Sequence, residues 1–143
     1  MTPTGESGSS LIGHVFERRY VLDSPLGGGD ESREPTSWRA SDEVLARPVV
    51  MRIAPGTRAG TKLHECASAY GSVRQASLAP VLDTVKEGSR GLRGVVREWV
   101  DGVPLLTALT ESGLRREESV TLVRAIAEAL QCLEAEWREL EQG

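Results

Sequence analysis

The sequence predicts an α+β fold: a five-stranded antiparallel sheet with one inserted helix, followed by two helices of which the second is long. Two observations support this class. Short β-branched and apolar runs, bounded by glycine, proline and charged residues, fill most of residues 19–102. From residue 104 onward, apolar residues recur every three or four positions, which is the period of a helix that buries one face. The sheet therefore belongs to the first part of the chain and the two following helices to its end.

Three strands are expected first: RYVLDSPL (19–26), SWRASD (37–42) and RPVVMRIA (47–54). The run GGGDESREPT after the first strand predicts a loop, since glycine, proline and charge dominate it. The short connection EVLA joins the other two strands, which favours an antiparallel meander. Ahead of them, residues 1–12 begin with a Gly/Ser/Thr-rich stretch that predicts a flexible tail.

One helix is expected next, over residues 61–76. The stretch TKLHECASAYGSVRQA lacks proline, and Leu63, Ala67, Tyr70 and Val73 recur at helical spacing. Beyond it, LAPVLDTVKEG and LRGVVREWVDG bracket the turn EGSRG and predict a hairpin. These are the fourth and fifth strands, so the helix is inserted after the third.

The end of the chain, residues 104–143, is expected to be helical. PLLTALTESG (104–113) predicts a short helix that ends at glycine, and REESVTLVRAIAEALQCLEAEWREL (116–140) predicts a long one. One apolar stripe on the long helix comprises Val123, Ile126, Leu130, Leu133 and Trp137. Burial of each such side chain is worth about 1.5 to 3 kcal/mol, so we expect the stripe to fold back on the sheet, to pair with a second copy, or to belong to a fragment whose partner lobe is elsewhere. The stripe therefore predicts self-association or a protein partner.

Composition excludes several function classes. The 143 residues carry a net charge of −4 and no strongly basic window, so nucleic-acid binding is not expected. The two cysteines, Cys66 and Cys132, have no metal-ligand spacing, which predicts free thiols and no metal site. No signal-peptide pattern and no apolar run of bilayer length occur, so we expect a cytoplasmic chain without a membrane span.

Several segments resemble, in order, parts of the small lobe of bacterial Ser/Thr protein kinases. RYVLDSPLGGG resembles the first strand and glycine-rich loop, and SWRASDEVLARPVVMRIAP the second and third strands. SLAPVLD is similar to the fourth strand, GVVREWVDGVPL to the fifth strand and hinge, and EESVTLVRAIAEAL to the first long helix of the large lobe. The resemblance implies a kinase-like N-lobe over residues 13–103, followed at 104–143 by helices that begin a C-lobe, the rest of which is absent from this sequence.

The resemblance assigns a nucleotide cleft to this lobe, and its glycine-rich loop departs from the family pattern. Gly27 and Gly29 stand at the first two glycine positions, but Ser32 stands at the third. The loop also carries three acids and one arginine. Acids held near phosphates oppose binding, by about 4 kcal/mol for two charges 4 Å apart at an effective dielectric near 20. The loop therefore predicts that phosphate binding is weakened or lost.

The third strand and the helix carry the next departures. The family pattern V-A-I-K places alanine and lysine on the face toward the nucleotide, and here Val50 and Arg52 stand at those positions. Arginine keeps the positive charge, but its planar fork is not equivalent to an ammonium group. Counting back from the fourth strand puts Cys66 where the helix glutamate belongs, with Glu65 one residue earlier. The sequence leaves open which of the two faces Arg52.

Arg97 stands at the end of the fifth strand, where kinases have an apolar residue behind the adenine. A second cation beside Arg52 predicts a cleft that accepts an anion or is plugged. The hinge backbone at Glu98 and Val100 keeps its capacity to bond adenine, because backbone groups do not depend on side-chain identity. We expect no cofactor, with ATP as the alternative, and the candidate binding residues are Gly27, Gly29, Val50, Arg52, Arg97, Glu98 and Val100.

No H-R-D, D-F-G or A-P-E motif occurs in the sequence, so we expect no catalytic residue. VVREWVDG and WRASDEVLARPV are also similar to a narrower group, the degenerate kinase-like domains attached to lipid II flippase-type membrane proteins of some bacteria. The sequence thus favours a non-catalytic, pseudokinase-like binding or regulatory module in signalling or cell-envelope regulation. The alternative is the nucleotide-binding N-lobe of a Ser/Thr kinase, whose phosphotransfer requires a C-lobe. A third hypothesis is a remnant reading frame with no selected role.

Overall fold

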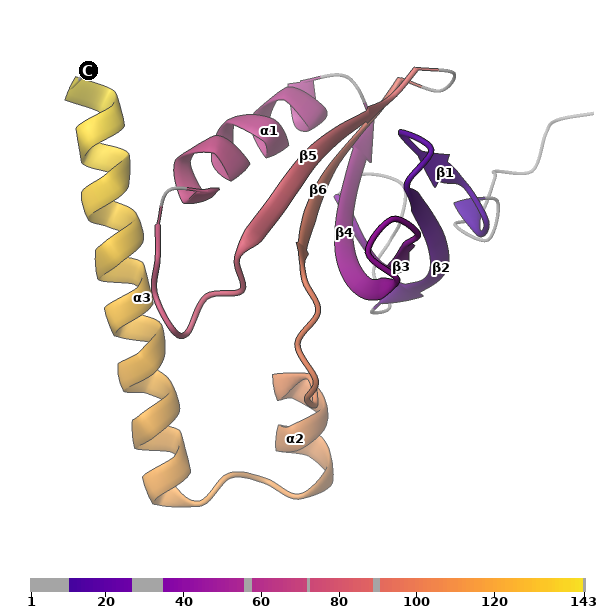
Figure 1. Cartoon of the computed structure of the whole chain (residues 1–143). Coiled ribbons are helices and arrows are strands. Elements are labelled where there is room, and N and C mark those ends of the chain that lie inside the picture. Colours follow the sequence, from indigo (N-terminus) through magenta and orange to yellow (C-terminus); the bar gives the residue numbers. More distant parts are fainter. Residues whose placement is uncertain (1–10, 27–34, 56–57, 72, 89–90, 143) are drawn as a thin grey trace, which may run out of the picture.

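The computed structural model describes residues 11–26, 35–55, 58–71, 73–88 and 91–142. Six strands form one antiparallel sheet in the order β1-β2-β3-β4-β6-β5. Their bounds are β1 (Val15–Phe16), β2 (Tyr20–Leu26), β3 (Thr36–Asp42), β4 (Arg47–Pro55), β5 (Val81–Glu87) and β6 (Leu92–Glu98). The three helices are α1 (Arg58–Gly71), α2 (Leu105–Glu111) and α3 (Arg116–Gln142). Figure 1 shows α1 beside β5 and β6, with α3 on the outer side of α1.

One face of the sheet holds the hydrophobic core. Strand side chains alternate between faces, and on β4 the core side receives Val49, Met51 and Ile53. Neighbouring strands add the other members of the cluster, which are Phe16, Tyr20, Leu22, Trp38, Ala40, Val85 and Val96. A Cβ on Gly94 would lie 2.9 Å from Val85 Cγ2, so glycine is needed there for close packing of the core. The intervening residues of β4 and β6 face the other way and are available for a site.

The turn between β3 and β4 is fixed by Asp42, which is buried. Arg19 donates two hydrogen bonds to its carboxylate, both 2.9 Å long, and the amides of Val44 and Leu45 donate to Oδ1. The paired guanidinium is the main reason that the pKa of Asp42 lies far below its ordinary value, with the two amides adding to the effect. This charge cluster holds β3 and β4 in register at the turn that joins them.

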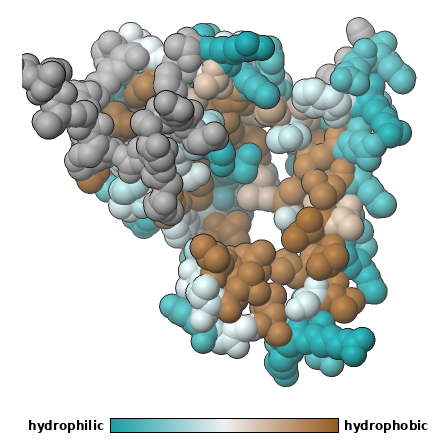
Figure 2. Space-filling view, turned by 180° about the vertical axis from the view of Figure 1, so that it is seen from behind, coloured by the Kyte–Doolittle hydropathy of each residue, from teal (hydrophilic) through white to brown (hydrophobic). Residues whose placement is uncertain are grey.

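The end of the chain forms an arm, which we define as residues 103–142 and which contains α2 and α3. Helix α3 contacts the rest of the structure through α1, and α2 has no buried residue. Large apolar side chains of the arm are exposed by 44 to 72%, and they are Val103, Leu105, Leu106, Leu109, Val120, Val123, Ile126, Leu130 and Trp137. Figure 2 shows apolar side chains gathered over α2 and the facing side of α3. The stripe predicted on the long helix exists and remains largely uncovered.

The α+β class, the meander and the helix order are confirmed, with two corrections. A sixth strand, β1, pairs Val15 with Val21 and Phe16 with Tyr20. The helix expected at 61–76 instead spans Arg58–Gly71, because Val73 and the following residues form the turns that lead to β5. Of the tail expected over residues 1–12, residues 1–10 lie outside the described part, and Leu11 packs against the core.

Candidate functional site

Strands β4 and β6 bring two arginines together on the face opposite the core. Val50 pairs with Arg97 and Arg52 pairs with Val95, so the arginines are diagonal neighbours on adjacent strands. Residues two apart on a strand lie on one face, which places Val50, Arg52 and Arg97 on the same side. The sheet register therefore places Arg52 and Arg97 on one face, as the sequence predicted.

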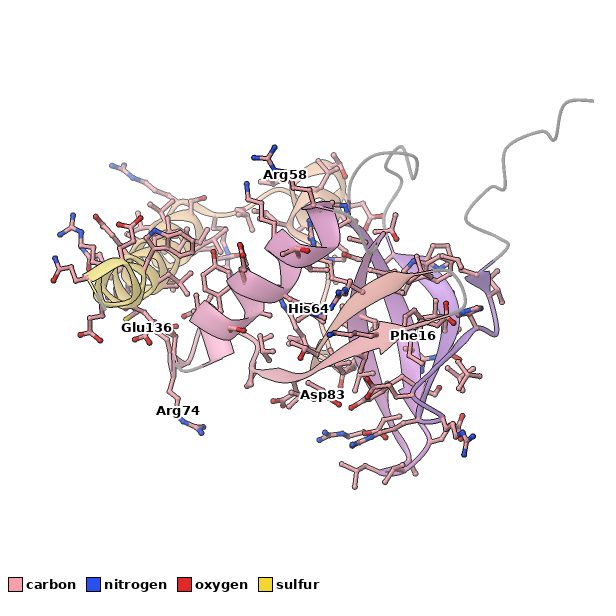
Figure 3. The ribbon with its side chains drawn as sticks, turned by 90° about the horizontal axis from the view of Figure 1, so that it is seen from above. Phe16, Arg58, His64, Arg74, Asp83 and Glu136 are labelled. Atoms are coloured by element: carbon pink, nitrogen blue, oxygen red, sulfur yellow. The ribbon has the colours of Figure 1, made fainter. Side chains whose placement is uncertain are left out.

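Helix α1 covers this face and closes one side of a cleft. Its residues Lys62, Leu63, Cys66 and Tyr70 line the cleft together with Arg52 and Arg97. The helical residues are spaced by one, three and four positions, so they lie on a single face of α1. The cleft has a volume of about 450 Å³. Figure 3 shows α1 between α3 and the sheet with His64 pointing toward the strands, where its Nε2 lies 3.2 Å from Gly94 O.

The charged side chains that line the cleft among the described residues are all positive. Arg52, Lys62 and Arg97 line it, and its described lining includes no carboxylate. Arg97 Nε is buried and has no hydrogen-bond partner among the described residues. Burial, followed by the nearby positive charge of Arg52, lowers the pKa of Arg97 from its ordinary value. The protein thus keeps an incompletely solvated cation beside another cation, which favours binding of an anion between them.

The helix residue that faces Arg52 is Cys66 rather than Glu65. Cys66 is half-buried and lines the cleft, whereas Glu65 is exposed and is not part of its lining. No ion pair between Arg52 and Glu65 is present in the described structure. The sequence left open whether Glu65 or Cys66 faces Arg52, and the structure places Cys66 there. Arg52 on β4 therefore faces a thiol and not the carboxylate of Glu65.

Among the remaining candidate residues, Val50, Glu98 and Val100 do not line this cleft. Gly27 and Gly29 lie outside the described residues. Val50 is half-buried on the same face as Arg52 but does not line the cleft. Glu98 and Val100 are exposed, and the Glu98 amide donates a hydrogen bond to Pro80 O.

Lys62 and Tyr70 are cleft residues that the sequence interpretation did not single out. They flank Cys66 at four residues on either side, and this spacing was the available signal because it places all three on one helix face. Tyr70 and Arg97 also border a smaller cavity of about 160 Å³ that reaches Leu133 of α3. The cleft and the arm therefore meet at these two residues.

Two further findings concern metal ligands and membrane spans among the described residues. The described residues contain no cluster of three or more His, Cys, Asp or Glu side chains placed to hold a metal ion. Within the same ranges, no helix has the length and apolar character needed to cross a bilayer.

Comparison with known proteins identifies the fold. No protein-family model matches the sequence, and no curated protein matches it either. The structure is similar to that of Rad53, residues 1–466, solved in complex with AMP-PNP, with a TM-score of 0.69 and 13% sequence identity. The similarity covers 82% of this chain but only 31% of that one. The chain therefore has a protein-kinase-like N-lobe fold followed by a long C-terminal helix, and it spans about a third of the matched protein.

Proposed function

We propose that the chain is a non-catalytic, kinase-like binding module whose arm binds a second apolar helical surface. The exposed apolar face of the arm carries this proposal, because leaving so many large side chains in water is unfavourable unless another surface covers them. Each side chain buried in a complex stabilises it by about 1.5 to 3 kcal/mol before the cost of association. Binding by the arm requires no chemistry from the cleft.

The occupant that we propose for this face is a second copy of the chain. Helix α3 has 27 residues, which corresponds to a length of about 40 Å at 1.5 Å per residue. Two copies related by a two-fold axis present the same stripe to each other, and a helix of this length is sufficient to build an interface of ordinary size. Two exposed ion pairs lie near the ends of α3, Arg138–Glu134 within the helix and Arg115–Glu118 at its start, where Arg115 precedes the first helical residue.

The lack of catalysis is supported by the cleft and by the sequence. Arg52 stands where the kinase resemblance places the nucleotide lysine, and Cys66 stands opposite it in place of an acid. The 143 residues contain none of the large-lobe catalytic motifs. The narrower resemblance to domains of lipid II flippase-type proteins suggests a cytoplasmic regulatory role linked to the cell envelope.

The experiment that tests the proposal measures mass against concentration by light scattering and sedimentation equilibrium. The wild type is expected to dimerise, and Val123→Ser to weaken the dimer by about a hundredfold, since the change removes one buried valine from each copy and each is worth about 1.5 kcal/mol. Val44→Ser is the matched control because both valines are 65% exposed and Val44 lies in the β3–β4 turn. A wild type that stays monomeric at every concentration overturns the proposal.

A second candidate function is a nucleotide-binding N-lobe of a Ser/Thr kinase, favoured by the fold that the chain shares with a protein solved with AMP-PNP. Thermal unfolding with and without Mg-ATP separates the candidates, because a ligand raises Tm only if it binds the folded state. We expect no rise that depends on the adenine ring. A rise of several degrees with Mg-ATP that adenosine competes away would favour the second candidate.

A further inference from the structure

The described lining of the cleft between α1 and the β4–β6 face carries positive charge only. Arg52, Lys62 and Arg97 approach it from three elements, and no carboxylate belongs to its described lining. The side chain of Arg52 has no ion pair with a described residue. Repulsion between neighbouring guanidinium groups is unfavourable unless a counter-charge lies between them. The charge distribution of the described residues therefore points to an anion from outside them.

Arg97 gives a second and independent reason. Buried polar groups in folded proteins are almost always hydrogen-bonded, and the exceptions call for an explanation such as an ion. Arg97 Nε is buried without a partner among the described residues. A guanidinium presents its N–H groups as a planar fork that matches two oxygens of a phosphate or carboxylate. An oxyanion at this position would satisfy the donor that the described residues leave without a partner.

We propose that this cleft is a binding site for a small oxyanion of the phosphate class, held by Arg52, Lys62 and Arg97. Three cations match a phosphate dianion better than a single carboxylate. A volume of about 450 Å³ accommodates the group. The apolar side chain of Leu63 lines the cleft beside the cations and lowers the local dielectric, which strengthens the attraction. The site does not depend on association through the arm, and α1 presents Cys66 to the cleft instead of an acid that would neutralise Arg52.

The test uses the full chain and inorganic phosphate as the probe, with Tm and calorimetric affinity as readouts. Sodium chloride at equal ionic strength is the reference, since salt also screens repulsion between the arginines. Phosphate is expected to raise the Tm of the wild type above this reference. Arg97→Leu is expected to abolish that rise, and in chloride its Tm should exceed that of the wild type, because an unpaired buried cation is replaced by an apolar side chain.

Two further variants guard against effects on folding. Lys62→Gln changes an exposed side chain at the rim and is expected to weaken phosphate binding by about tenfold, the value of one charge-assisted hydrogen bond. Arg74→Gln is the matched control, because Arg74 is exposed, does not line the cleft, and points away from α1 and the strands in Figure 3. Its phosphate affinity should equal that of the wild type.

The outcomes distinguish free phosphate from a nucleotide as the source of the oxyanion. They also distinguish failure of the oxyanion site from failure of the proposed function of the arm. If phosphate raises Tm equally in the wild type and in Arg97→Leu, the effect is the general stabilisation by excluded salts and the site is overturned. ADP without metal should compete with phosphate while adenosine should not; competition by adenosine overturns the proposal in favour of a nucleotide site. A chain that dimerises without binding phosphate refutes the oxyanion site alone. A monomer that binds phosphate refutes only the proposed function of the arm.

Discussion

The sheet and the arm use the same kinds of apolar residue to different ends. In the sheet, Phe16, Trp38 and Met51 are at most 1% exposed and belong to one continuous core. Among the described side chains of the arm, Ala129 alone is a buried hydrophobic residue. Leu106 and Val123 are 72% and 65% exposed. The sheet buries its own hydrophobic side chains, whereas those of the arm stay exposed and are available to another surface.

This difference separates stability from binding within one small chain. Strands of the sheet are paired with neighbours and packed on a shared core, so loss of one core side chain is felt throughout. Helix α3 is held by its own backbone hydrogen bonds, by its contact with α1, and by surface ion pairs such as Arg138–Glu134. Such exposed pairs are worth only about 0.3 to 0.5 kcal/mol each. Substitutions should therefore divide into those that unfold the chain and those that alter its association.

The largest effect on stability is expected at Trp38. Its side chain is the largest of the fully buried ones, and Trp38→Ala leaves a cavity that the surrounding strands cannot fill. We expect a loss of about 3 to 5 kcal/mol in the free energy of unfolding, measured by urea denaturation. A loss below about 1 kcal/mol would break the comparison, because it would mean that the sheet is not the stable unit.

The intermediate effect is expected at Tyr20, where a polar atom sits at the edge of the core. The Tyr20 hydroxyl donates a 2.9 Å hydrogen bond to Asp83 Oδ2. Burial, with this bond adding to it, raises the pKa of Tyr20 to about 12 from its ordinary value of 10.0. Tyr20→Phe should cost about 1.5 to 3 kcal/mol at neutral pH, the net worth of a hydrogen bond to a charged group.

The sign of the pH dependence follows from the raised pKa of Tyr20. The contribution of the phenol to stability is complete below about pH 10, the pKa in the unfolded chain, and is lost as pH rises toward 12. The difference in unfolding free energy between the wild type and Tyr20→Phe should therefore shrink over this window. Urea denaturation of both proteins at a series of pH values measures this difference. The series should run from about pH 8 to above about pH 11, because this range brackets the pKa of tyrosine in the unfolded chain. A difference that stays constant would show that Tyr20 does not titrate with folding.

The sequence predicted the sheet better than it predicted the site, for physical reasons. Alternation along 47–54 is strong, because Val49, Met51 and Ile53 all enter the core. Strand β1 has only two residues, Val15 and Phe16, too few to show a period of two, and its pairing depends on β2.

At the site, the arginine pair followed from strand alternation, whereas the helix residue opposite it did not. A shift of one residue turns a helix by about 100°, and the register of α1 is set by burial of Gly60, Ala67 and Ala69 against its neighbours. That tertiary packing placed Cys66 rather than Glu65 opposite Arg52, and it brought Lys62 into the cleft. Propensity and spacing along the chain alone could not choose between these registers.

The smallest effect on stability, and the one that sharpens the comparison most, is expected in the arm. At concentrations low enough to keep the chain monomeric, Val123→Ser should change the free energy of unfolding by less than about 0.5 kcal/mol, because the side chain is already in contact with water. The matched variant Val44→Ser should behave alike, since that valine is equally exposed. As concentration rises, the two variants should diverge, because a covered Val123 adds to the stability of the associated state and Val44 does not. A loss of about 2 kcal/mol for Val123→Ser in the monomer would mean that the arm folds back onto the sheet in solution, and the division between a stable sheet and a binding arm would then fail.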